Sequence, residues 1–342
     1  MMSQSSLRQW VERTELEIGD TAVLVGNGLC RYKSGPGVSW YDLISKAISE
    51  HSAHSNWSAD HLNKMSLLQV FDILANEYQG ERRIVHEVKH SIADFIRKWK
   101  PTLAHRKLVR SAISLNIPIL TLNFDRCLIE ADDSVRRNHK MVDGRYRPNR
   151  TESAAFSWHY PWMCYYSNQD VRNVKRQFAI WHLHGTAEYR QSIRLGLEDY
   201  MGLSAKARNW LYSPGGPFRG DRRSEPDWIG VDSWLNMFFS SSLLIYGIGL
   251  GRDELFLRWL LIRRMEHLKA SNRSTNAITT FVCLRSDLQS EAGIETRLFL
   301  EKLGIEIVYG ASRKQIYESL PGTYLHRMLR RSNRSSREKP RG

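Results

Sequence analysis

The sequence predicts an α/β fold, built on a parallel sheet of about six strands with helices on both faces. Short apolar runs alternate with longer helical patterns along the 342 residues, and this alternation is typical of strands joined by crossover helices. Three of the runs end abruptly in glycines or polar residues, at Gly26–Gly28, Asn123 and His184. Open α/β folds bind ligands at the carboxyl ends of their strands, so these three ends predict an enzyme site.

The first strand is expected at residues 21–25. It follows an N-terminal segment, residues 1–20, in which the apolar spacing over residues 5–20 predicts a short amphipathic helix. A glycine-rich loop follows the strand. A helix then begins near Trp40, with Ser39 as its expected N-cap, because a serine hydroxyl can accept a first-turn N–H.

Residues 66–100 carry apolar residues at helical spacing, which places a helical block between the first two strands. Another helix, over residues 102–115, leads into the strand Ile117–Leu122, and the next strand is Phe178–Leu183. Strands and helices then alternate, with strands at Leu243–Tyr246, Ala277–Cys283 and Ile305–Tyr309 and helices at Asp253–Leu268 and Glu291–Leu303.

One domain over residues 21–320 accounts for these elements, with insertions at about residues 55–100, 126–177 and 186–230. The last two insertions are polar and aromatic with weak periodicity. Together the insertions are expected to form a smaller, helical lobe that frames the site. The tail, residues 331–342, is basic, rich in serine and free of apolar residues, which predicts disorder.

Lysine and arginine number 50 against 36 aspartates and glutamates, a formal net charge of +14. This excess indicates an anionic partner, which would be nucleic acid, an acidic protein or a phosphorylated small molecule. A solvated basic surface without a partner is the equally weighted alternative. The apolar runs are too short to cross a bilayer and the N-terminus has no apolar signal core, so we expect a cytoplasmic protein with no membrane partner.

The four cysteines, Cys30, Cys127, Cys164 and Cys283, are far apart in the sequence and form no CxxC pair. This spacing argues against a structural zinc site and a disulfide framework, so no metal is expected. Cys30 lies in the glycine loop, but it has no sequence-adjacent base to activate it as a nucleophile.

Two strands run into glycine-rich turns, Gly26-Asn27-Gly28 and Gly247-Ile248-Gly249-Leu250. Glycines at such turns let backbone N–H groups approach a phosphate, and two neighbouring turns would hold the two halves of a dinucleotide. Taken singly, each turn is equally well explained as a tight structural connection. The first turn also lacks the third glycine of the GxGxxG pattern.

Asn123 and Asp125 follow a buried strand, where an amide can hold a ribose hydroxyl or a water. In isolation, a turn or a helix cap explains these two residues better. His182 and His184 share one strand face by parity. We favour His184 as the functional histidine because Gly185 behind it would let a ligand come close, and we expect His182 to be a core residue.

The order of these motifs resembles the sirtuin-like superfamily, and more narrowly its bacterial NAD-cleaving branch found in antiphage defence systems. Gly26–Gly28 is similar to the family's GAG-type phosphate turn, Thr121–Asp125 to its T-x-N-x-D motif, and His184-Gly185 to its catalytic HG. Gly247–Leu250 resembles its G-x-S-L-type nucleotide turn, with Gly249 in place of the serine. The motifs span most of the chain.

The resemblance implies a Rossmann-like fold that hydrolyses NAD+, its substrate, to nicotinamide and ADP-ribose. It implies that Asn123 orients the ribose and the attacking water, that His184 acts as a base near its unperturbed pKa, and that Asp125 orients these groups from behind. The residues implied to bind the dinucleotide are Gly26, Asn27, Gly28, Thr121, Gly185, Gly247, Gly249 and Leu250.

Protein-deacylating sirtuins carry four zinc cysteines after the HG motif, whereas here only Cys283 lies beyond Gly185. The resemblance therefore implies NAD hydrolysis without zinc rather than deacylation. It also implies a homo-oligomer that acts beside a partner ATPase or sensor subunit.

Two other functions stay open. A module of this fold would bind NAD or nucleic acid without turnover, or an enzyme with the same residues would transfer ADP-ribose to a macromolecule. The sequence does not distinguish NAD from NADP as the preferred dinucleotide.

Overall fold

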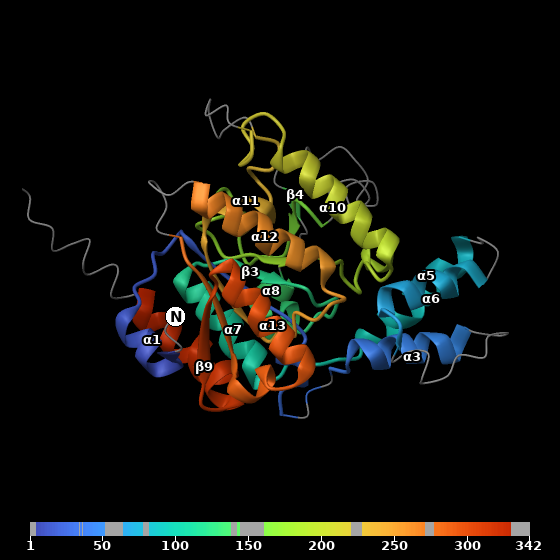
Figure 1. Ribbon diagram of the computed structural model, residues 1–342, viewed down its shortest axis with the longest axis horizontal. Coiled ribbons are helices and arrows are strands. Elements are labelled where there is room, and N and C mark those ends of the chain that lie inside the picture. Colours follow the sequence, from blue (N-terminus) through green and yellow to red (C-terminus); the bar gives the residue numbers. More distant parts are fainter. Residues whose placement is uncertain are drawn as a thin grey trace, which may run out of the picture.

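The computed structural model of the protein describes residues 5–33, 35, 37–51, 64–77, 82–137, 142–143, 161–219, 228–270 and 277–329. Its centre is a parallel sheet of seven strands in the order β1-β9-β8-β7-β2-β3-β6. The strands are β1 (Ser5–Ser6), β2 (Thr21–Val25), β3 (Ile119–Thr121), β6 (Ile180–His182), β7 (Ser242–Tyr246), β8 (Thr279–Leu284) and β9 (Glu306–Gly310). Helices flank this sheet on both faces, so the predicted Rossmann-like α/β fold class is confirmed (Figure 1).

The strand order places the topological switch point of the sheet between β2 and β7. From β2 the chain adds β3 and then β6 on one side, and it returns to add β7, β8 and β9 on the other. Val23 of β2 lies opposite Ile119 of β3 on one side and Leu244 of β7 on the other. Connections that leave neighbouring strands in opposite directions open a crevice at the carboxyl ends of the strands, where open α/β sheets bind ligands.

The periodicity predicts one helix over residues 5–20, but the structure divides this segment. Ser5 and Ser6 form β1, which pairs with the edge strand β9. The helix α1 is confined to Leu7–Arg13, because Ser6 caps its first turn in a reciprocal pair with Gln9 and the backbone is extended at Thr14. The sheet consequently has one strand more than expected.

Two layers of helices cover the two faces of the sheet. The flanking helices are α1, α7 (Leu103–Leu115), α10 (Leu197–Leu211), α11 (Trp234–Ser240), α12 (Leu255–Ala270), α13 (Glu291–Leu303) and the π-helix η5 (Gln315–Tyr324). Alternate residues of β2 show the division, because strand side chains point to opposite faces in turn. Ala22 and Leu24 pack with α10, α11, α12 and α13, whereas Val23 and Val25 pack with α1, α7 and η5.

A third apolar cluster belongs to a lobe of three helices, α3 (Trp40–His51), α5 (Leu67–Glu77) and α6 (Arg82–Ile96), which lie together at the right of Figure 1. Ser39 caps α3 as predicted. Its hydroxyl accepts the Asp42 N–H at 3.1 Å, and the Asp42 carboxylate accepts the Ser39 N–H at 2.9 Å. The core of this lobe extends to the loop after β3, so the lobe stands beside the carboxyl edge of the sheet.

Shorter elements complete the described chain. They are α2 (Gly28–Arg31), η1 (Ile129–Ala131), α8 (Asp133–Arg137), η2 (Arg190–Ser192), η4 (Arg285–Leu288) and an antiparallel pair of β4 (Val142–Asp143) and β5 (Cys164–Tyr165). The third predicted insertion contains a long helix, α10, whose bounds the weak periodicity did not indicate. The basic tail, residues 331–342, lies outside the described residues. No described helix is long and apolar enough to cross a membrane.

Candidate functional site

A cavity of about 520 Å³ opens at the carboxyl ends of the strands, at the switch point between β2 and β7. On the β3–β6 side, its lining includes Asn123, Asp125 and His184. On the opposite side it includes residues 281–283 of β8, and the turns after β2 and β7 lie between. A volume of this size is typical of small-molecule and cofactor sites.

Hydrogen bonds to β3, β6 and α2 hold Asn123 in place. Its N–H donates to the Thr121 hydroxyl at 3.1 Å, and its carbonyl lies 2.8 Å from Nδ1 of His182. Because a carbonyl only accepts, Nδ1 of His182 carries the proton. The Asn123 side chain donates from Nδ2 to Sγ of Cys30 at 3.4 Å, which fixes the orientation of the amide beside the cavity.

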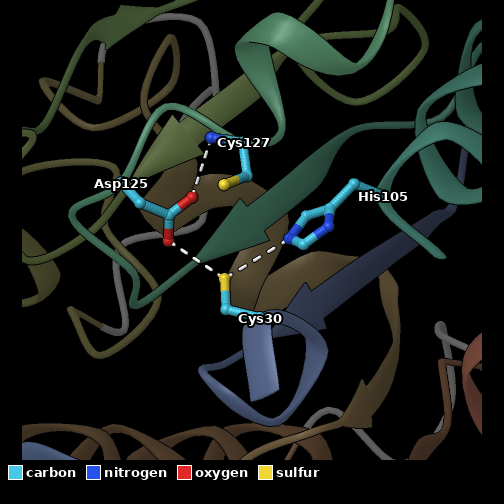
Figure 2. Close-up of side chains that lie close together, drawn as sticks. All are labelled: Cys30, His105, Asp125 and Cys127. Carbon is cyan, nitrogen blue, oxygen red and sulfur yellow. Dashed lines mark hydrogen bonds between the residues drawn. The ribbon is translucent and has the colours of Figure 1, made fainter. Parts of the chain in front are cut away.

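Four polar side chains gather next to Asn123: Cys30, His105, Asp125 and Cys127 (Figure 2). Their sulfur, nitrogen and oxygen atoms all lie within 4.8 Å of one another, and all four residues are buried. No base neighbours Cys30 in the sequence, but the fold places Nε2 of His105 3.3 Å from its sulfur. The spacing of the cysteines argued against a metal site, whereas the fold assembles a set of possible metal donors.

His184 lies just beyond β6 and is 2% exposed. Its Nδ1 lies 3.2 Å from the hydroxyl of Tyr200, and the two rings pack with centroids 5.0 Å apart. Its Nε2 has no hydrogen-bond partner within the described part of the chain. Burial lowers the pKa of His184 to about 3, and Arg194 adds to the effect. The expectation of an unperturbed pKa is therefore wrong, and the imidazole is neutral at physiological pH.

Two residues that the resemblance places near the ligand, Thr121 and Gly185, lie outside the cavity lining, as does His182. Thr121 is buried, and its hydroxyl accepts the Asn123 N–H. His182 is a buried core residue, which strand parity alone could not distinguish from His184. Gly185 has a φ of +105°, and a Cβ there would lie 2.2 Å from the Ser192 carbonyl oxygen. The backbone conformation and the contact with Ser192 thus require the glycine, and close approach of a ligand stays a prediction.

The two glycine turns line the cavity and contact each other. The Gly28 N–H donates to the Gly247 carbonyl at 2.8 Å. A Cβ on Gly26 would lie 2.7 Å from the Ile248 side chain, and one on Gly28 would lie 2.5 Å from the Tyr317 hydroxyl. Gly249 differs, because no atom lies within 4 Å of its Cβ position. Gly26 and Gly28 therefore permit the close packing of the two turns, while Gly249 faces open space.

Two further residues of these turns, Asn27 and Leu250, also line the cavity. The Asn27 side chain donates to the Val38 carbonyl at 2.5 Å, so it fixes the loop that leads to α3. Leu250 is a non-glycine residue at φ +49°, and its carbonyl accepts from Thr296 at 3.3 Å and from Arg258 at 3.4 Å.

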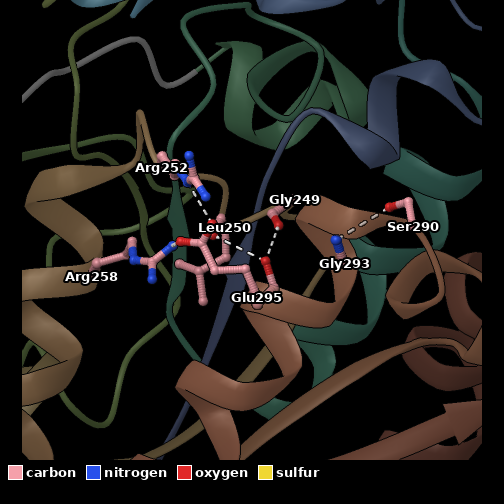
Figure 3. A network of polar contacts seen from close by, with 8 residues as sticks. Gly249, Leu250, Arg252, Arg258, Ser290, Gly293 and Glu295 are labelled. Atoms are coloured by element: carbon pink, nitrogen blue, oxygen red, sulfur yellow. Dashed lines mark hydrogen bonds and ion pairs between the residues drawn. The ribbon is translucent and has the colours of Figure 1, made fainter.

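Figure 3 shows how α13 supports the turn after β7. Glu295 pairs with Arg252 at 2.5 Å and with Arg258 at 3.1 Å, and Arg258 is the residue that also holds the Leu250 carbonyl. Arg252 is exposed, so its pair contributes little to stability. The half-buried Arg258 instead links Glu295 of α13 to the Leu250 carbonyl, and this contact keeps Leu250 in its left-handed conformation.

The cavity lining also includes residues that were not among the predicted site residues, such as Tyr200, Glu254 and the arginines Arg31, Arg252 and Arg313. Burial raises the pKa of Glu254 to about 7, with Asp253 adding to the effect. Trp40 and Phe124 form an aromatic wall with ring centroids 5.7 Å apart. Glu254 lies shortly after the second glycine turn in the sequence, and this position could have indicated it as a cavity residue.

No protein-family model matches this sequence, and no curated protein matches it either. The fold, the cavity and the residues around it are therefore the observations on which a function rests.

Proposed function

We propose that this chain is an NAD+ hydrolase of the sirtuin-like class, which cleaves the bond between nicotinamide and ribose and releases nicotinamide and ADP-ribose. One observation carries the proposal: Asn123 and His184, remote in the sequence, line one cavity together with both glycine turns. An amide and a neutral imidazole beside a site of this size are groups that can orient a ribose and a water for hydrolysis.

The two sides of the switch point suit the two halves of NAD+. Backbone N–H groups of the glycine turns can approach the pyrophosphate, and Arg31, Arg252 and Arg313 add positive charge around it. Trp40 and Phe124 offer the nicotinamide ring a flat apolar surface on the side of Asn123. The adenosine would then extend towards β8.

The leaving group sets what the protein must supply. Nicotinamide leaves as a neutral molecule because its ring is cationic in NAD+, so departure needs no general acid. The bond breaks with positive charge developing on the ribose, and groups that orient the ribose hydroxyls and the attacking water stabilise that state. Asn123 has this role in the proposal, with its amide oriented by Cys30.

His184 acts in the proposal as a hydrogen-bond acceptor for a ribose hydroxyl or for the water. The neutral ring must then carry its proton on Nδ1, where the Tyr200 oxygen 3.2 Å away accepts it, and the lone pair lies on Nε2. A pKa of about 3 makes this imidazole a weak base. Its main contribution is therefore orientation of the nucleophile rather than proton storage.

Quantifying nicotinamide and ADP-ribose after incubation of the purified protein with NAD+ tests the proposal. We expect Asn123→Ala and His184→Ala each to lower kcat by about 10²–10⁴-fold, the usual effect of removing such a group. His267→Gln, on α12 and away from the cavity lining, is the matched control and should keep full turnover. Unchanged turnover in His184→Ala would remove this residue from the mechanism.

Calorimetric titration with NAD+ distinguishes an enzyme that binds NAD+ but needs an activator from a protein that does not bind NAD+. Protein that neither binds NAD+ nor releases nicotinamide contradicts the proposed function. ADP-ribose recovered on a macromolecule would favour transfer over hydrolysis, and salt-dependent DNA retention without turnover would favour a nucleic-acid-binding module. The homo-oligomer, the partner ATPase or sensor, and the role in antiphage defence stay predictions from the sequence.

A further inference from the structure

The group of Cys30, His105, Asp125 and Cys127 lies at the meeting point of three separate parts of the chain. Cys30 is on the short helix α2, His105 is in the first turn of α7, and Asp125 and Cys127 lie in the loop after β3. All four side chains point towards a common centre in Figure 2. Their donor atoms lie within 4.8 Å of one another, and the four residues are 0–2% exposed.

The donor types in this group are those that zinc prefers. Two thiols, one imidazole and one carboxylate give two sulfur, one nitrogen and one oxygen ligand, which together make a closed tetrahedral site. Such a closed set leaves no position for a substrate, so it would be structural or regulatory rather than catalytic.

The Asp125 carboxylate is buried without a cationic partner. Its oxygens accept from the Cys30 thiol at 3.2 Å and from the Cys127 N–H at 2.8 Å. Among the described residues, no lysine, arginine or histidine forms an ion pair with Asp125. A buried anion without a compensating cation is costly, and a bound metal ion would supply the missing charge.

The Cys30 thiol donates a hydrogen bond to the Asp125 carboxylate, so it carries its proton when no cation is present. A metal ion reverses this balance, because it binds the thiolate and releases the proton to solvent.

Both ring nitrogens of His105 have polar partners in the structure. Burial lowers the pKa of His105 to about 4, so the ring is neutral. Nε2 faces the Cys30 sulfur at 3.3 Å, while Nδ1 lies 2.8 Å from the Thr102 hydroxyl and 3.1 Å from the Thr102 backbone nitrogen. Without metal, the Thr102 N–H donates to Nδ1 and the ring proton sits on Nε2. Ligation would move that proton to Nδ1, where the Thr102 hydroxyl can accept it.

We propose that Cys30, His105, Asp125 and Cys127 bind one Zn²⁺ ion through both sulfurs, Nε2 and a carboxylate oxygen. Two thiol protons pass to solvent, and no group is oxidised or reduced. The ion reaches the site from the cavity, since Asp125 lines the cavity wall.

Zinc at this position would couple to the cavity through Asn123. The amide of Asn123 donates to the Cys30 sulfur, and a thiolate accepts that hydrogen bond more strongly than a thiol does. Metal binding would thus fix the orientation of the amide. This coupling rests on the proposed function, whereas the metal site itself does not.

Cobalt titration of chelator-treated full-length protein tests the site without any measurement of activity. We expect one equivalent of Co²⁺ to give a sulfur-to-cobalt charge-transfer band and the visible bands of tetrahedral cobalt, both abolished by Zn²⁺. Cys30→Ser and Cys127→Ser should each weaken the charge-transfer band, and Cys164→Ser, which removes a buried cysteine outside the group, should leave it unchanged.

Two further measurements keep the proposal testable if the cysteine variants do not fold. Zn²⁺ should raise the Tm of the wild-type protein, because a ligand that binds only the folded state stabilises it. Thr102→Val should weaken Zn²⁺ binding by about 10–100-fold, the usual effect of removing a partner of a metal-bound histidine. The absence of tetrahedral thiolate bands in folded wild-type protein, or bands that survive both cysteine substitutions, would overturn the proposal.

Discussion

His182 ends β6 and His184 lies two residues beyond it, and the two rings have different surroundings. His182 donates to the Asn123 carbonyl beneath the loop after β3, whereas His184 lines the cavity and contacts Tyr200. Burial lowers the pKa of both rings. The difference between a structural and a candidate catalytic histidine therefore lies in what packs around each ring.

Gly185→Ala is expected to destabilise the protein. Holding a non-glycine residue at the φ of +105° costs about 1–3 kcal/mol, and the overlap of the new Cβ with the Ser192 carbonyl adds to this. Gly202→Ala is the matched control, because Gly202 lies within α10 and faces open space. It should stabilise the protein by about 0.5–1 kcal/mol, since alanine favours a helix over glycine. Urea unfolding measures both changes, and equal effects of the two substitutions would contradict this prediction.

At the scale of elements, one buried side chain fixes α12 to the sheet. Arg264 is fully buried and donates to the Thr279 hydroxyl at 2.7 Å, to the Ser241 carbonyl at 2.7 Å and to the Ile278 carbonyl at 3.1 Å. It also donates to the Phe238 carbonyl. These acceptors belong to the end of α11 and the starts of β7 and β8. Burial lowers the pKa of Arg264 to about 9, so the guanidinium keeps its charge at neutral pH.

Arg264→Met should lower the free energy of unfolding by at least about 3 kcal/mol, because each acceptor left unsatisfied in the core costs about 1–3 kcal/mol. Arg263→Met on the same helix is the control. Its ion pair with Glu266 at 2.8 Å is partly exposed, so its loss should cost no more than about 1 kcal/mol. Thermal and urea unfolding of both variants provide the comparison, and a tolerated Arg264→Met would show that water replaces the lost donors.

At the scale of the whole molecule, the order of the strands brings the candidate site together. β3 and β6 follow β2 on one side, and β7 begins the return on the other, so two glycine turns and two polar strand ends meet at one crevice. The same burial that builds this centre keeps three histidines neutral inside it. These are His105, His182 and His184.

Stability should fall as the pH is lowered from about 6.5 to 5. The folded-state pKa values of the three histidines lie below the value of about 6.5 expected after unfolding, so the unfolded chain binds more protons across this window. Each histidine contributes up to about 1.4 kcal/mol per pH unit.

Glu254 opposes the trend, because its raised pKa stabilises the fold at low pH and this contribution is lost as the pH rises through about 7. Burial lowers the pKa of His267 too, so four histidines against one glutamate leave a net loss on acidification, and urea unfolding at pH 7.5, 6 and 5 measures it. Constant stability over that range would contradict the neutral state of these histidines.

Hydrophobic patterning predicted most of the fold because strands and helices bury apolar residues at different periods. β2, β7 and α13 lie where their patterns place them, and Ser39 caps α3 through the local contact that its sequence indicates. α10 escaped although its buried residues, Tyr200, Leu203, Ala207 and Leu211, recur at helical spacing, because exposed apolar residues such as Met201 blur the contrast between its two faces. β1 escaped because a two-residue strand is defined by its partner β9, not by any pattern of its own.

The sequence by itself determined the α/β alternation and which residues stand at strand ends, since both follow from local patterns of polarity and glycine. Only the tertiary structure decided that Asn123 and His184 line the same cavity and that Gly185 is needed for its positive φ. It also decided that Cys30 lies beside His105, Asp125 and Cys127. Proximity between distant segments, and the desolvation that shifts a pKa, depend on how elements pack in three dimensions, and no local pattern contains that information.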